Sequence, residues 1–195
     1  MKRLLLILIL TLSFQSWTKA NDIREFEIEG MSIGDSLLDF ISESEISSLS
    51  RYDKKNGSYK SNKFFDLRLK KNINKYSEVL VGVKFMDKSY KIFSLAGAKD
   101  YSNNVSNCYV EMTNIEKTFN ELFKNAKVKK VNKAKHPSDK SGLSTISSVY
   151  FDFPNQDYAS IQCFDWHKDM NFWDNLRIGL FSADYSKWLQ YEAHK

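Results

Sequence analysis

The alternation of apolar and polar residues predicts most of the strands in this chain. A strand with one buried face shows a period of two, because successive side chains point to opposite sides of a sheet. Six strand-like runs cover 65–69, 79–85, 90–96, 147–153, 158–166 and 176–181. The link at 86–89 is short enough for a hairpin turn, so we expect the second and third strands to pair antiparallel.

A second spacing, of three and four residues, predicts helices that cover the sheet. Apolar residues follow this spacing over 106–125, the longest predicted helix, and over 184–192, a short one at the end of the chain. Two segments between the elements are polar. We expect a loop or an exposed hairpin tip at 51–63 and a basic connector at 127–142.

The segment before these elements combines a strand pattern with a helix start. Residues 25–29 alternate strictly, which predicts a half-buried strand that ends at Gly30. Ser32 then has the position of a helix N-cap, with Asp35 three residues later. A second short helix is expected at 42–49.

The order of the elements indicates the fold class. Strand-strand-strand-helix occurs twice, at roughly 64–125 and 147–192. The short links exclude a parallel doubly wound sheet, because parallel crossovers need about a dozen residues or more. We therefore predict a single α+β domain over 21–195, with helices packed on an antiparallel sheet of about six strands.

The first twenty residues have the pattern of a secretory signal peptide. A positive start, Met1-Lys2-Arg3, precedes the apolar run 4–14, and the small residues Thr18 and Ala20 precede a cleavage site. The apolar run is shorter than the ~20 residues that span a bilayer. We expect residues 1–20 to be removed, leaving a periplasmic or secreted protein with no stable membrane span.

Charge narrows the choice of partners. The formal charge is +5, but three cations lie in the first twenty residues, and without that segment the charge falls to about +2. A basic run remains at 124–140, which we interpret as a solvated face, with an anionic surface as the alternative. Net charge therefore gives no support to nucleic-acid binding.

The two cysteines indicate a disulfide. Cys108 lies on the apolar face of the longest predicted helix, and Cys163 shares its strand face with Ala159 and Ile161. An exported chain meets an oxidising compartment, where an even number of cysteines favours pairing. We predict a Cys108–Cys163 bond between helix and sheet; a catalytic pair or free thiols are the alternatives.

One string looks like a hydrolase motif. Gly30-Met31-Ser32-Ile33-Gly34-Asp35-Ser36-Leu37 resembles the nucleophile elbow of α/β-hydrolases and the first block of GDSL esterases. This resemblance implies Ser32 or Ser36 as the nucleophile. The later Gly-x-Asn-Asp and Asp-x-x-His blocks of GDSL esterases do not occur, and a hydroxyl nucleophile needs a base. Our preferred interpretation is a helix cap.

Two further groups of residues are candidates near the C-terminus. Asp165 and His167 could bind a divalent metal with Asp169, but our preferred interpretation is a polar strand end that runs into a loop. Trp166, His167, Phe172 and Trp173 form our candidate ligand surface, because exposed aromatic rings with polar neighbours stack on sugars or peptides. Aromatic residues at such spacings are also common in cores. We predict no cofactor.

Three segments carry a resemblance over most of the mature chain. They are Phe26 to Leu38, Lys135 to Gly142, and Cys163-Phe164-Asp165-Trp166. The chain resembles a family of small, uncharacterised exported bacterial proteins, which implies no activity and no site residues. Our hypothesis is a non-catalytic envelope protein that binds a ligand or a partner protein. The alternative is an exported hydrolase using Ser32 or Ser36, or a metal at Asp165 and His167.

Overall fold

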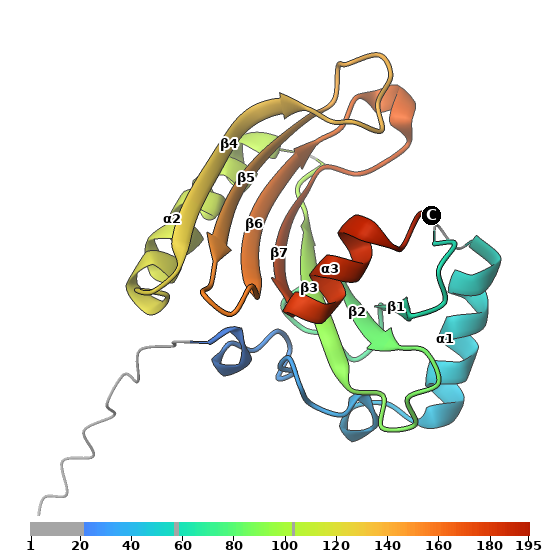
Figure 1. Ribbon diagram of the computed structural model, residues 1–195. Helices are drawn as coiled ribbons and strands as arrows, with labels where there is room; N and C mark the ends of the chain where they lie inside the picture. The colour runs from blue at the N-terminus through green and yellow to red at the C-terminus, as the bar shows by residue number, and fades with distance from the viewer. Residues whose placement is uncertain (1–21, 57–58, 103) are drawn as a thin grey trace, which may run out of the picture.

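Seven strands form one curved antiparallel sheet with helices on both sides (Figure 1). The computed structural model describes residues 22–56, 59–102 and 104–195, so the predicted signal peptide at 1–20 lies outside the described residues. The strands are β1 (Phe64–Leu69), β2 (Glu78–Lys84), β3 (Ile92–Asp100), β4 (Lys127–Lys135), β5 (Thr145–Asp152), β6 (Tyr158–Asp165) and β7 (Asn175–Phe181). The helices are α1 (Glu43–Asn56), α2 (Val105–Leu122) and α3 (Ala183–Tyr191), with 3-10 turns at Ile23–Glu25, Leu37–Asp39 and Lys168–Met170.

Two meanders meet in the middle of the sheet. Strands β1-β2-β3 and β4-β5-β6-β7 each run antiparallel through short links, and β3 pairs with β7 to give the order β1-β2-β3-β7-β6-β5-β4. Helix α2 connects the two meanders. The predicted α+β class and antiparallel pairing are confirmed, but the sheet has seven strands rather than six.

The additional strand is β4, in the segment that we expected to be a connector. It is an edge strand with almost every side chain exposed, so the burial alternation that reveals other strands is missing. Lys129 pairs with Asp152 of β5 at 2.5 Å, and Lys130 pairs with Glu116 of α2. Lysines on an edge strand discourage pairing with a second chain.

The two faces of the sheet bury different groups. On one face, Leu176, Ile178 and Leu180 of β7 join a core that also contains α2 residues such as Met112 and Phe119. We call the opposite face the concave face, because the sheet curves around α3 on that side (Figure 1). There Trp188 of α3, with Tyr185, packs on Phe64 and Phe181.

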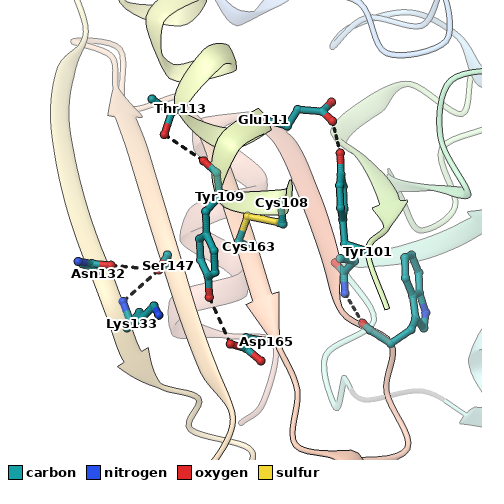
Figure 2. Close-up of a disulfide and its surroundings, with 12 residues drawn as sticks. Tyr101, Cys108, Tyr109, Glu111, Thr113, Asn132, Lys133, Ser147, Cys163 and Asp165 are labelled. Atoms are coloured by element: carbon teal, nitrogen blue, oxygen red, sulfur yellow. Dashed lines mark hydrogen bonds between the residues drawn. A yellow bond between two sulfur atoms is a disulfide. The ribbon is translucent and has the colours of Figure 1, made fainter. Parts of the chain in front are cut away.

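The predicted disulfide is present and lies between α2 and β6 (Figure 2). The Cα atoms of Cys108 and Cys163 are 6.0 Å apart, and neither residue is exposed to solvent. The bond is consistent with an oxidising, extracytoplasmic location.

The N-terminal segment departs from the prediction. Residues 25–29 form no strand: the backbone makes one isolated bridge, Ile28 to Met31, around a turn with positive φ at Glu29 and Gly30. The alternation still describes the side chains, because Ile28 is buried and Phe26 packs on Phe119 with ring centroids 5.0 Å apart. An apolar period of two therefore marked a segment lying over the core, not a sheet ladder.

The expected helix at Ser32 is also wrong. A single 3-10 turn, Leu37–Asp39, begins at Ser36, whose hydroxyl accepts a hydrogen bond from the Leu38 N–H at 3.3 Å. The Ser32 hydroxyl instead donates to the Phe26 carbonyl. Helix α1 follows at Glu43–Asn56 and continues into the segment 51–63 that we expected to be a loop. Within the described residues, no helix is both long and apolar enough to cross a membrane.

Reduction of the disulfide should lower the free energy of unfolding by about 4 kcal/mol, because the bond joins residues 55 positions apart and restricts the unfolded chain. Denaturant titrations of oxidised and reduced protein at one pH measure this difference without any change of side-chain volume. An unchanged midpoint would contradict the structural role of the bond.

Candidate functional site

Two of the four candidate ligand residues lie in one group of rings at the end of β6. The indole of Trp166 stacks parallel to Phe164 at 5.9 Å and lies 4.7 Å from the ring of Phe172. The imidazole of His136 lies 4.2 Å from the same indole. We call His136, Phe164, Trp166 and Phe172 the aromatic cluster; Phe172 is 57% exposed.

The other two candidates make different contacts. The His167 backbone N–H donates to the Ser144 hydroxyl at 2.9 Å, and its imidazole lies 3.5 Å from the Asp169 carboxylate. Trp173 is half-buried, and its carbonyl accepts a hydrogen bond from the Asn175 amide. Of the four predicted residues, Trp166 and Phe172 therefore belong to one group of rings, together with His136 and Phe164, which the sequence did not indicate.

The loop between β4 and β5 brings His136 to this cluster. Asp139 holds the loop, because its carboxylate accepts hydrogen bonds from the backbone N–H and hydroxyl groups of Ser141 and Ser144 at 2.6–2.8 Å. These bonds hold the pKa of Asp139 far below its usual value. Burial lowers the pKa of His136, and the nearby charge of Arg177 lowers it further, although Asp139 opposes both effects.

Arg177 of β7 is an unpaired cation on the concave face. Its guanidinium carbon lies 5.0 Å from the centroid of Phe164, a cation–π distance. Its Nε is buried without a hydrogen-bond acceptor, and no carboxylate in the described part of the chain forms an ion pair with it. Two positions earlier on the same face, the side-chain oxygen of Asn175 is buried without a donor. Buried polar atoms without partners are rare in folded proteins.

The nearby carboxylates are already occupied. Glu78 is 2% exposed and accepts two 2.6 Å hydrogen bonds from Arg68, while Lys70 lies 3.8 Å away. Asp66 accepts hydrogen bonds from the hydroxyls of Tyr185 at 2.6 Å and Tyr59 at 2.7 Å. Both carboxylates near Arg177 therefore already accept hydrogen bonds from other side chains.

Burial lowers the pKa of the Arg177 guanidinium from its ordinary value, the charges of Glu78 and Asp66 oppose this shift, and the like charge of Arg68 adds to it. An arginine nevertheless keeps its proton in proteins. The concave face of β7 therefore offers a charged group with free donors directly over an aromatic ring.

The serines of the hydrolase hypothesis are not beside a base. The Ser36 hydroxyl donates to the Ser89 carbonyl at 2.7 Å, and Ser32 donates to a backbone carbonyl as well. Among the described residues, neither serine shares a hydrogen bond with a histidine. Both hydroxyls thus donate to backbone carbonyls, Ser32 within its own segment and Ser36 to the β2–β3 link.

The two residues of the metal hypothesis do not converge. Asp165 faces α2, where the hydroxyl of Tyr109 lies 3.4 Å from its carboxylate (Figure 2), while His167 lies beyond the end of β6. Over residues 22–56, 59–102 and 104–195, no group of three His, Cys, Asp or Glu side chains is placed to hold a metal ion.

Comparisons with protein-family models, with curated proteins and with solved structures find no match to this chain. The resemblance to small exported bacterial proteins stays a prediction. The function is therefore argued from the site itself.

Sequence reasoning missed Arg177 and Asn175, although a signal was present. The two polar residues alternate with Leu176, Ile178 and Leu180, which form the core-facing set of the same strand. In a strand between two neighbours, a lone arginine at this period belongs to the face opposite the core. No role was predicted for that face, so Arg177 was not among the candidate residues.

Replacing Ser36 by alanine should destabilise the fold by about 1 kcal/mol, because Ser36 caps a turn and also bonds to the β2–β3 link. Ser32→Ala removes one long hydrogen bond of 3.3 Å and should have a smaller effect. Denaturant unfolding of both variants measures the difference. A larger loss for Ser32→Ala would contradict this assignment of the cap.

The Asp66 carboxyl should make stability depend on pH. Burial raises its pKa, against the opposing hydrogen bonds from Tyr185 and Tyr59, so the folded protein loses stability as pH rises from about 4 through the raised value. Asp66→Asn cannot ionise, and its stability relative to the wild type should improve as pH rises from about 4 to 7.

Asp87→Asn is the matched control for this pH test. Hydrogen bonds from Ser89 lower the pKa of Asp87, so its contribution is lost as pH falls, and the difference should have the opposite sign. Thermal unfolding at several pH values measures both differences. A pH-independent difference for Asp66→Asn would contradict the raised pKa.

Proposed function

We propose that this is a non-catalytic binding protein of the cell envelope, periplasmic or secreted, which holds an anionic ligand on the concave face of its sheet. The observation that carries the proposal is Arg177, a partly buried guanidinium with a buried Nε and no acceptor in the described chain. Its planar donors fit a carboxylate or phosphate in a two-bond geometry.

The surroundings of Arg177 suit a ligand that has a ring as well as a charge. Phe164 lies under the guanidinium and stacks on Trp166, which in turn contacts Phe172 of the aromatic cluster. Gln162 is the neighbour of Arg177 on β6 and supplies an amide on the same face. An anionic group on Arg177 would place an attached ring against the aromatic cluster.

The disulfide and the N-terminal sequence support the location. The Cys108–Cys163 bond fits an oxidising compartment, and the predicted signal peptide at 1–20 would deliver the chain there. Ligand binding needs no converging nucleophile and base, and the hydroxyls of Ser32 and Ser36 donate to backbone carbonyls instead.

Arg177→Met should weaken binding of an anionic ligand while leaving the fold as stable as the wild type or more stable. Methionine keeps an apolar stem on Phe164 and removes a buried charge that has no partner. A buried charge of this kind commonly destabilises the folded state, so its removal should not lower stability. Loss of the charged hydrogen bonds should weaken binding of glucuronate, used as an anionic probe, by about tenfold or more. Calorimetric titration and thermal unfolding measure the two effects.

Three further measurements control this test. Glucose should not bind, because it lacks the charge. Lys117→Gln removes an exposed cation on α2 and should leave glucuronate binding unchanged. Arg177→Lys keeps the charge but loses the planar geometry, and should bind with intermediate affinity. If glucuronate fails to bind, or binds Arg177→Met and the wild type equally well, the proposed site is wrong.

A further inference from the structure

A groove of about 670 Å³ lies between α3 and strands β5 and β6. Tyr150 and Tyr158 contribute from the strands, and Lys187, Gln190 and Tyr191 from the helix. Its volume is within the range of known ligand pockets. The aromatic cluster at the far end of β6 is separate from it.

The tyrosines give the groove a flat, polar-edged wall. The ring of Tyr158 stacks on Phe181 with centroids 4.5 Å apart and planes 15° apart, so it is fixed against the sheet. Tyr150 lies 6.3 Å from Tyr158 in an edge arrangement. Tyr191 is 56% exposed, which leaves its ring available from the helix side.

Side chains on one face of the sheet connect the groove to Arg177. The Gln162 amide donates to the hydroxyl of Tyr150 at 3.2 Å, and Gln162 is the cross-strand neighbour of Arg177. Tyr158, Gln162 and Phe164 all lie on the concave face, because they are separated by even numbers of residues along β6. From Tyr158 to Phe164 the strand rises roughly 20 Å, so one ring cannot reach both ends.

We infer that the groove and the Arg177 region are two subsites of one elongated site, and that the ligand is an acidic oligosaccharide. This inference rests on the proposed function. Tyrosine rings suit the flat faces of sugars, amide and hydroxyl groups suit their hydroxyls, and Arg177 and Lys187 suit their acidic substituents.

An acidic peptide fits less well. Extended peptides are commonly held by backbone hydrogen bonds along a sheet edge, and a sheet face offers none, because its backbone groups already pair between strands. The edge strand β4 carries several lysines and a register irregularity between Val131 and Ala134, which are features that oppose strand addition. A glycan needs only side chains.

The test compares four probes on the purified, disulfide-bonded protein: galacturonate, tetragalacturonate, maltotetraose and tetraglutamate. Tetragalacturonate should bind at least about tenfold more tightly than galacturonate, because it fills both subsites. Maltotetraose and tetraglutamate should bind more weakly than tetragalacturonate by a similar factor. Calorimetric titration at fixed ionic strength gives all four affinities.

Variants separate the two subsites. Tyr191→Ala should remove the advantage of the tetramer while leaving galacturonate binding unchanged, and Arg177→Met should weaken both. Phe40→Ala is the matched control, because Phe40 is another exposed aromatic residue, 40% exposed and outside the groove.

Each alternative outcome is informative. Equal affinity for monomer and tetramer, insensitive to Tyr191→Ala, would overturn the second subsite and leave the proposed function intact. Preferred binding of tetraglutamate would overturn the glycan assignment in favour of a peptide. Failure of every acidic probe would overturn both the inference and the proposed function.

Discussion

Strand β7 faces two different environments, and both the core and the candidate site depend on that division. Leu176, Ile178 and Leu180 enter the core beneath α2, whereas Asn175 and Arg177 lie on the concave face. The strand pairs with β3 and β6 and so joins the two meanders. A slip of one residue would move the arginine into the core and the leucines out of it, so the core fixes the register and thereby the position of the arginine.

The apolar periodicity of the sequence predicted the strands and helices that bury one face against the core. It did not predict elements that lack such a buried face. Strands such as β5 and β6, and the amphipathic α2 with Cys108, followed from periodicity because the core imposes it. Strand β4 has one neighbour and exposes nearly every side chain, so its sequence resembled a basic linker. The segment 25–29 failed in the opposite way, since an apolar period records contact with the core and not the partner of the backbone.

The candidate site was only partly predictable, because its members come from separate parts of the chain. Trp166 and Phe172 are close in sequence, and their aromatic composition indicated a surface. His136 comes from the β4–β5 loop and Arg177 from β7, and only the pairing of β6 with its two neighbours brings them to Phe164. No spacing rule contains that information, since sheet order is set by long-range contacts.

The disulfide and the unpaired polar groups lie on opposite faces of one sheet. The disulfide and the larger hydrophobic core lie on the α2 side, where Cys108 and Cys163 are fully buried, and a smaller cluster around Trp188 lies on the concave side. The concave side contains an unpaired guanidinium, and an unpaired charge of this kind would destabilise the fold if it were buried in a core. If the proposed function holds, an anionic ligand would supply the missing acceptor and add its binding free energy to that of the folded state. Under the proposed function, the core on the α2 side supplies stability that lets the Arg177 region stay without an acceptor until a ligand binds.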